Sequence, residues 1–349
     1  MEQKKSAYTV QHSMIAKGIF IIMLLMHHVF YGSAIGDFGV ETVLKPETLW
    51  MLSTYGKICV GGFAFISAYG MALQLRKSEK PDAVLVKTIW RRRLVKLESA
   101  CLFIYPIAVL YKRLVVGQEV KEVFSDGTAF QPVYMILDAV GLADFLRTPR
   151  LNVTWWYLSF AICLILAVPA LYYLYRRVGI SLFFLALFVF SDKKIAIIIL
   201  GIAFACEDWF DRIAAYIEQG LIRKIGLFLV CLIGIYTTYT VTVYTQSVES
   251  IEWVAGVFVI LLVTFYLSKT ILLSRILAFL GKHSANIFLI HTFIYLYFYE
   301  EFIYSFKRAG MILLVLLGLS LAVSVVLELV KKGIRYDRLV QRLAGQNFS

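Results

Sequence analysis

The sequence predicts an all-α integral membrane protein, a bundle of about ten transmembrane helices with both termini in the cytoplasm. Of its 349 residues, 60% are hydrophobic and only 17% are charged, and the mean hydropathy is +0.77. Soluble domains contain about 45–50% apolar and about 25% charged residues, so this chain carries more apolar surface than one core can bury. The apolar residues are grouped in long blocks, and the basic residues are concentrated in alternate loops.

The apolar blocks predict the individual helices. A transmembrane helix needs about 17–25 mostly apolar residues. Blocks of this kind cover residues 14–34, 53–74, 97–116, 153–175, 225–243, 252–268, 285–304 and 310–330. Two shorter runs, Gly179–Phe190 and Ile195–Cys206, are separated by Ser191 to Lys194. We interpret them as two short helices, which brings the number of spans to about ten, and a re-entrant pair is the alternative.

The distribution of charge predicts the orientation. The chain has 35 Lys and Arg against 23 Asp and Glu, a formal net charge of +12. With the N-terminus in the cytoplasm, 24 of the 35 basic residues lie in cytoplasmic segments, which is the bias expected of the plasma (cell) membrane proteins that follow the positive-inside rule. Residues 1–13 and 331–349 are then cytoplasmic tails of a transmembrane domain over 14–330. This distribution argues against a nucleic-acid partner, but charge alone does not separate binding of the lipid bilayer from binding of a phosphorylated small molecule.

Lys17 and His28 are the strongest candidate site residues. They are eleven residues apart in the first predicted helix, which corresponds to a rise of about 16 Å and to nearly the same face of the helix. Ionisable residues in spans usually mark a pathway or a site, and histidine is the natural general base near neutral pH. The alternative is that His28 bonds to a neighbouring helix while the ammonium group of Lys17 reaches the headgroups. The adjacent His27 points about 100° away from this face.

Basic residues also crowd the entrance of the third predicted helix. Arg92, Arg93 and Lys96 lie just before its apolar block. Arginine forks hold phosphate oxygens well, as a nucleotide-like donor would require. The positive-inside bias and anionic lipid headgroups are the alternative explanation.

Other polar groups lie within or beside the spans. Ser67 and Tyr69 follow the small residues Gly61 and Gly62 in the second helix and are expected either to line a channel or to bond across helices. Ser284 resembles an N-cap that starts a helix, and this places His291 about 10 Å inside that helix. Trp156 fits an interfacial aromatic belt.

Residues Val133–Leu146, in the longest polar segment, predict a helix that lies on the surface or caps a cavity. The acidic residues Glu207, Asp208 and Asp211 form a patch without the spacing of paired metal ligands, so we expect no metal site.

Taken in order, these clusters resemble the membrane-bound acyltransferase-3 family. The shared features are Lys17 and His28 in helix one, Phe65 to Tyr69 in helix two, the basic run at Arg92, the Trp-Tyr-Leu start of helix four, and Gly281 to His291. Together they cover residues 14 to about 330. The chain departs from the family pattern at Ala68 (usually Gly), at Lys96 (usually Arg) and at Glu98-Ser99 (often Pro).

The resemblance implies an O-acyltransferase, an enzyme of the acyltransferase class that moves an acyl group, commonly acetyl, to a hydroxyl. The co-substrate is acyl-CoA (acetyl-CoA), with no bound cofactor, and the acceptor is a cell-surface carbohydrate or glycolipid. His28 is then catalytic, and Lys17, Arg92, Arg93 and Lys96 bind the donor. Ser67, Tyr69, Trp156 and His291 support the channel.

Three further expectations complete the sequence-based interpretation. Without a fused outer domain, the chain works within the membrane or with a separate extracytoplasmic or polysaccharide-synthesis partner. The main alternative function is a transporter or flippase of a sugar-containing lipid or small anion. Transporters often contain an inverted repeat, and the sequence shows none, which argues against that alternative. A polysaccharide polymerase ranks third because the 117–152 loop is modest in size.

Overall fold

The protein is all-α. A computed structural model describes residues 6–78, 83–127, 129–189, 194–245 and 252–345, and no β-strand occurs in them. Residues Ser191 to Lys193, the centre of the polar break predicted between the two short runs, lie outside these described residues. The all-α part of the predicted fold class is therefore confirmed for the described residues.

Six helical segments of the described chain are long and apolar enough to cross a membrane. They are Val10–Phe30, Pro46–Arg76, Ala83–Leu114, Val153–Val178, Leu221–Tyr244 and Ala309–Gly333. Lys194–Cys206 and Trp253–Lys269 are shorter apolar helices. A span count of about ten and the cytoplasmic location of both termini remain predictions.

The chain forms two compact units. The first comprises Met1–Pro81 and Val168–Ser284, and the second Asp82–Ala167 and Ala285–Ser349. Helices α8 (Trp156–Val178) and α14 (Ile271–Thr292) each contribute to both units.

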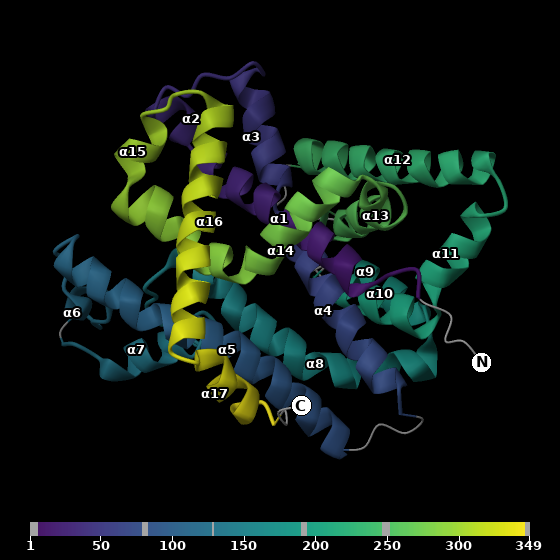
Figure 1. Cartoon of the computed structure of the whole chain (residues 1–349), viewed down its shortest axis with the longest axis horizontal. Helices are drawn as coiled ribbons and strands as arrows, with labels where there is room; N and C mark the ends of the chain where they lie inside the picture. The colour runs from purple at the N-terminus through teal and green to yellow at the C-terminus, as the bar shows by residue number, and fades with distance from the viewer. Residues whose placement is uncertain (1–5, 79–82, 128, 190–193, 246–251, 346–349) are drawn as a thin grey trace. The chain divides into compact units, whose positions relative to one another are not determined.

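In the first unit, α4 is the central helix and packs against α1, α10 and α13. Its helices are labelled in Figure 1. Besides parts of α8 and α14, they are α1 (Val10–Phe30), α2 (Ala34–Asp37), α3 (Pro46–Tyr55), α4 (Ile58–Arg76), α9 (Ser181–Val189), α10 (Lys194–Cys206), α11 (Trp209–Ile217), α12 (Leu221–Thr245) and α13 (Glu252–Phe265).

Glycines allow these helices to approach closely. A Cβ atom on Gly61 would lie 2.2 Å from the carbonyl oxygen of Trp253, and one on Gly62 would lie 2.2 Å from the ring of Phe20. A Cβ on Gly201 would lie 2.8 Å from the carbonyl oxygen of Phe65. The small residues of α4 therefore serve helix packing, as small residues do in membrane helices generally.

The second unit is built around α5, which packs against α7 and α17. Its elements are α5 (Ala83–Leu114), α6 (Val120–Val123), α7 (Pro132–Ala139), a 3₁₀ turn (Val153–Trp155), the first part of α8, the last part of α14, a π-helix (Phe293–Phe298), α15 (Glu300–Tyr304), α16 (Ala309–Gly333) and α17 (Tyr336–Leu343). The surface helix predicted over Val133–Leu146 is thus present but ends at Ala139.

One predicted helix start is wrong. Ser284 is not an N-cap, because α14 already begins at Ile271 and continues without a break to Thr292. The Ser284 hydroxyl instead donates to the carbonyl oxygen of Gly281, 2.9 Å away in the preceding turn. Serine often makes this bond inside helices, so a cap-like sequence did not require a cap.

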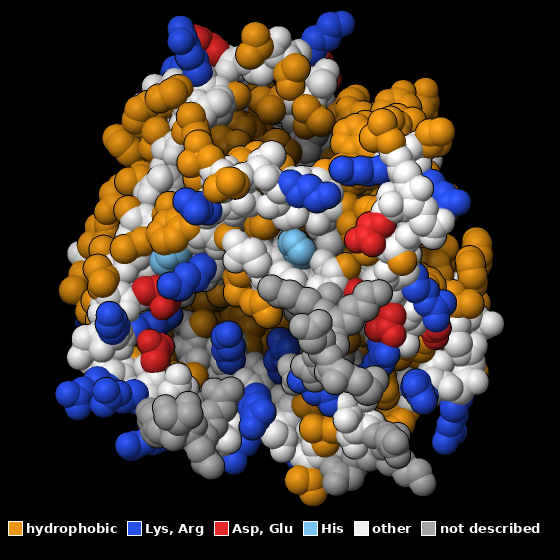
Figure 2. Space-filling model, turned by 45° about the vertical axis from the view of Figure 1, so that its right-hand side comes forward, with side chains coloured by type: hydrophobic (Ala, Val, Ile, Leu, Met, Phe, Trp, Pro, Cys, Tyr) orange, Lys and Arg blue, Asp and Glu red, His pale blue; other side chains and the backbone are white. Residues whose placement is uncertain are grey.

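Many large apolar side chains remain exposed on the long helices. Examples are Ile233 of α12, which is 62% exposed, and Leu314 of α16, which is 62% exposed. One face of the molecule is drawn in Figure 2, with hydrophobic side chains in orange. Soluble monomers rarely expose such continuous apolar surface, so it is the surface expected to meet lipid.

Candidate functional site

Lys17 and His28 lie on one uninterrupted helix, α1. The helical geometry on which their predicted alignment depends is therefore present, with about 16 Å of rise between them. Both side chains are half-buried. The helix begins at a capping box, in which the side chain of Thr9 accepts from the backbone of His12 and the side chain of His12 accepts in return.

The two adjacent histidines have different environments. His27 is buried, and its Nδ1 lies 2.9 Å from the carbonyl oxygen of Ser53, which ties α1 to α3. The His27 and His28 rings are 4.8 Å apart between centroids. His27 is thus held by a backbone oxygen of α3, whereas His28 is half-buried on the face of α1 that carries Lys17.

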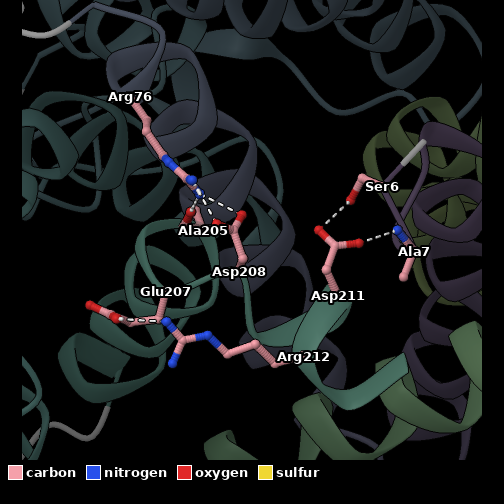
Figure 3. Close-up of polar contacts among 8 residues, drawn as sticks. All are labelled: Ser6, Ala7, Arg76, Ala205, Glu207, Asp208, Asp211 and Arg212. Carbon is pink, nitrogen blue, oxygen red and sulfur yellow. Dashed lines mark hydrogen bonds and ion pairs between the residues drawn. The ribbon is translucent and has the colours of Figure 1, made fainter. Parts of the chain in front are cut away.

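The start of α1 is fastened to the corner between α10 and α11 (Figure 3). The backbone N–H of Ala7 donates to Oδ1 of Asp211 at 2.6 Å, and the ring of Tyr8 stacks on Phe210 at 4.3 Å between centroids. Tyr8 is only 5% exposed. The contacts of Asp211 thus fix the end of the helix that carries Lys17 and His28.

Asp208, at the same corner, binds the end of α4. Both of its carboxylate oxygens accept from the guanidinium of Arg76 at 2.6 Å, and Arg76 also donates to the carbonyl oxygen of Ala205 at 2.6 Å (Figure 3). The Arg76 fork lowers the pKa of Asp208. Asp208 and Asp211 of the predicted acidic patch therefore have structural roles, and Arg76 is already engaged within the protein.

Ser67 and Tyr69 lie in the middle and the later part of α4, at a distance from the end of α1 that carries His28. Helices α1 and α4 are antiparallel, because contacts at their two ends run in opposite chain order. The ring of Tyr69 lies 5.2 Å from that of Tyr8, and a Cβ placed on Gly56 would lie 3.2 Å from the Cβ of His27. Tyr69 is thus on the order of 25 Å from His28 along α1. The structure brings neither hydroxyl to this imidazole.

A second motif meets α1 beside Lys17. A Cβ on Gly18 would lie 2.0 Å from the carbonyl oxygen of Leu277, and a Cβ on Gly281 would lie 1.8 Å from the carbonyl oxygen of Met14. The backbones of α1 and α14 are therefore in direct contact. The late Gly-Lys motif, although far away in sequence, packs on the helix that carries Lys17.

The predicted donor-binding residues Arg92, Arg93 and Lys96 lie on α5 in the second unit. Arg92 and Lys96 are exposed and Arg93 is half-buried. Within the described part of the chain, none of the three has a hydrogen bond or an ion pair. Their neighbour Arg91 is different, because its Nε donates to the carbonyl oxygen of Leu343 at 2.6 Å.

Helix α17 holds this part of α5. The hydroxyl of Tyr336 donates to the carbonyl oxygen of Ser99 at 2.9 Å, and its ring lies 5.0 Å from that of Phe103. The bond from Arg91 to Leu343 secures the other end of α17. The predicted C-terminal tail therefore includes a short helix that fixes the segment bearing the unpaired cations.

His291 is fully buried in the second unit, and its hydrogen bonds are internal. Nδ1 lies 2.8 Å from the carbonyl oxygen of Phe288, and Nε2 lies 3.3 Å from the hydroxyl of Thr292. The Thr292 hydroxyl is 3.0 Å from that of Thr154. These contacts join the end of α14 to the 3₁₀ turn that precedes α8.

The tryptophan that joins this cluster is Trp155. Its Nε1 donates to the carbonyl oxygen of Leu289 at 3.2 Å, and the side chain is 2% exposed. The predicted Trp156 is half-buried and contacts Tyr157 edge-on at 6.1 Å. Sequence alone could not separate the two, because a one-residue change rotates a side chain by about 100° around the helix.

Sequence reasoning missed a buried polar network between α14 and α16. Asn286 donates to Ser324 at 3.1 Å and to Glu328 at 2.7 Å, and Lys331 donates to Asn286 at 3.1 Å and to Glu328 at 3.0 Å. Lys331 is only 6% exposed. The signal that could have revealed it is the i, i+4, i+7 spacing of Ser324, Glu328 and Lys331 along one helical face.

It also missed polar residues beneath the loop that precedes α8. Asp138 is 2% exposed, and its Oδ2 accepts from the backbone N–H of Leu151 at 2.9 Å. Burial raises the pKa of Asp138 to about 6, against the opposing effects of that bond and of nearby Tyr105, Arg150 and Lys112. A lone Asp in a polar segment gives no sequence signal of such burial.

Comparison with known proteins gives one match. A family model described as an acyltransferase domain, of the acyltransferase-3 type, matches residues 14–329. Neither the curated proteins nor the solved structures compared with the chain include a match. The matched range contains every site residue predicted from the sequence, from Lys17 to His291.

Proposed function

Because the chain belongs to the acyltransferase-3 family, we propose that it is an integral-membrane O-acetyltransferase. It moves an acetyl group from cytoplasmic acetyl-CoA to a hydroxyl of a cell-surface carbohydrate or glycolipid. The observation that carries the proposal is the alignment of Lys17 and His28 on one face of α1, inside a family match that covers nearly the whole chain.

His28 serves as the general base. Its imidazole accepts the proton of the acceptor hydroxyl while the hydroxyl oxygen attacks the thioester carbonyl. The C–S bond then breaks, and the coenzyme A thiolate takes the proton from the imidazolium. The products are the O-acetyl ester and free coenzyme A, so proton and acyl group both balance. General-base catalysis of this type contributes about 10²–10⁴-fold to the rate.

Lys17 and the cations of α5 bind the donor phosphates. The absence of internal partners for Arg92, Arg93 and Lys96 in the described chain supports this role, because unpaired guanidinium groups suit bidentate phosphate contacts. The donor enters from the cytoplasm in this proposal, which requires the basic segments to lie on the cytoplasmic side of the plasma membrane. The positive-inside rule predicts this orientation, with both termini in the cytoplasm. His291 positions helices, and Ser67, Tyr69 and Trp156 support the bundle.

The test compares surface glycans from cells that carry the wild-type protein, His28→Ala or His27→Gln. Mass spectrometry is expected to find an acetyl ester with the wild type and with His27→Gln, and at least about a hundredfold less with His28→Ala. His27→Gln is the matched control because it alters the neighbouring ring, whose Nδ1 lies 2.9 Å from the backbone oxygen of Ser53. Full acetylation by His28→Ala would contradict the role of His28.

A transporter or flippase predicts a different result. Sealed vesicles containing the protein would then accumulate a labelled sugar lipid without any coenzyme A ester and without a covalent change. Accumulation of this kind, with no labelled ester formed when acetyl-CoA is supplied, would overturn the proposal.

A further inference from the structure

Helix α17 has three different faces, and one of them packs against α5. Tyr336, Val340 and Ala344 are spaced four residues apart and therefore share this face, and each of them is buried or half-buried. The hydroxyl of Tyr336 donates to the carbonyl oxygen of Ser99 of α5 at 2.9 Å. The other two faces of α17 are exposed, and each has a distinct composition.

The second face is apolar. Leu339 and Leu343, again four residues apart, are each 51% exposed. Ile334, in the turn that leads into α17, is 62% exposed, and Leu329, near the end of α16, is 63% exposed. The apolar surface that α16 is expected to present to lipid is therefore continued along the chain by α17. A pair of exposed leucines on one edge of a helix is typical of amphipathic helices that lie at a membrane surface.

The third face is basic. Arg338 and Arg342 are four residues apart and exposed, and helical geometry places them on the side of α17 away from Tyr336 and Val340. Two more exposed cations, Lys332 and Arg335, come directly before the helix.

Three of these four cations have no internal partner. Within the described residues, the side chains of Lys332, Arg335 and Arg338 make no hydrogen bond and no ion pair. Asp337 is the single acidic residue between Leu329 and the end of the chain, so the segment is strongly basic. Four or more cations beside a span, or on an amphipathic helix, are typical of segments that bind anionic lipid headgroups.

The turn before α17 holds the helix beside the end of a span. Arg335 has a φ of 58°, a left-handed conformation that ends the helical run of α16, and Figure 1 shows α17 turned away from the axis of α16. At the other end of α17, the Nε of Arg91 donates to the carbonyl oxygen of Leu343 at 2.6 Å. Because α16 is long and apolar enough to cross a membrane, a helix fixed at its end lies at the level of the headgroups.

We propose that α17 binds the anionic lipid surface on the side of the membrane that carries the C-terminal tail. Its basic face and the two preceding cations contact lipid phosphates, while Leu339 and Leu343 enter the boundary between headgroups and acyl chains. A soluble phosphate would supply the same acceptors but would leave the two leucines in water, so the apolar face assigns the surface to lipid. This inference does not depend on the proposed acetyl transfer.

The test measures hydrogen–deuterium exchange of the α17 amides in the full-length protein. Nanodiscs of phosphatidylglycerol, which is anionic, are compared with nanodiscs of phosphatidylcholine, which has no net charge. Exchange is expected to be at least about fivefold slower in phosphatidylglycerol, which is the effect of one basic residue close to an anionic surface. Equal exchange in the two lipids would overturn the proposal. So would an equal slowing by inorganic phosphate added to phosphatidylcholine nanodiscs, because it would assign the cations to a soluble ligand.

A charge variant and a matched control make the test specific. Lys332→Gln combined with Arg338→Gln is expected to reduce the difference between the two lipids at least about fivefold and to leave exchange in phosphatidylcholine unchanged. The control removes the same charge from two exposed arginines in the last turn of α8, as Arg176→Gln with Arg177→Gln. It is expected to keep the wild-type difference, and an equal loss in both double variants would show a general charge effect and contradict a site on α17.

A second variant tests the apolar face while every cation is kept. Leu339→Asn is expected to speed the exchange of α17 in both lipids, because the polar side chain no longer enters the acyl boundary. The thermal midpoint of each variant shows that the rest of the protein is folded. Exchange by Leu339→Asn equal to that of the wild type in both lipids would overturn the insertion of this face.

Discussion

Gly18 lies where α1 and α14 cross, and its replacement by alanine is expected to push these helices apart. A Cβ atom at this position would be 2.0 Å from the carbonyl oxygen of Leu277, and real Cβ contacts are essentially never closer than 3.0 Å. The two backbones must therefore separate locally by about 1 Å or more, because a helix carbonyl cannot rotate out of the way.

The magnitude follows from two opposing effects. Overpacking of this kind costs about 1–3 kcal/mol, and the upper part of that range applies because the clash is with backbone. Alanine also improves helix propensity by about 1 kcal/mol relative to glycine. The net loss of stability is then about 1–2 kcal/mol. Activity is expected to fall further, since a displacement of about 1 Å at a reacting group can cost a hundredfold in rate.

The assay measures the thermal midpoint in nanodiscs and acetyl transfer from acetyl-CoA for Gly18→Ala and Gly226→Ala. Gly226 of α12 is the control, because nothing lies within 4 Å of a Cβ placed there. That variant is expected to be as stable as the wild type or more stable. A Gly18→Ala protein with unchanged midpoint and unchanged transfer would refute the close crossing of α1 and α14.

Three further outcomes are expected. Arg76 lowers the pKa of Asp208, so the stability that this ion pair contributes is present above pH 3.8 and is lost as the pH falls below it. In thermal scans at acid pH, Asp208→Asn is therefore expected to lose less stability than the wild type. The pKa of Asp138 is instead raised to about 6, so the wild type is expected to lose stability as the pH rises from 3.8 to 6, and the absence of a smaller slope in Asp138→Asn would contradict this. Tyr336→Phe loses one hydrogen bond between α17 and α5, worth about 1 kcal/mol, and is expected to make α17 more sensitive to limited proteolysis. Equal cleavage of the wild type and the variant would argue against the attachment of α17 to α5.

Patterns of local origin could be predicted from the sequence. The all-α class follows from apolar blocks, and the alignment of Lys17 with His28 follows from helical periodicity within a single helix. The close packing at Gly61 and Gly62 follows from residue size. The first two depend on residues that are near one another in the chain, whereas the neighbours of Gly61 and Gly62, which are Trp253 and Phe20, are distant in sequence.

Features that depend on distant residues could not be predicted. The direction of α4 relative to α1 separates Tyr69 from His28, and no local pattern reveals which ends of two helices meet. The burial of Lys112 depends on Tyr297, which is far away in sequence. Ser284 resembles an N-cap because serine is common both at helix starts and inside helices. Inside α14 its hydroxyl instead bonds the carbonyl oxygen of the preceding turn.

The most direct test of the account is single-turnover transfer by the purified protein in nanodiscs, with acetyl-CoA and a carbohydrate acceptor. The release of the coenzyme A thiol and the formation of the acetyl ester are followed together for the wild type, His28→Ala and His27→Gln. The account expects both products with the wild type and with His27→Gln, and neither above background with His28→Ala. Equal thiol release and ester formation by His28→Ala would contradict the claim that this imidazole, aligned with Lys17 on α1, carries out the reaction.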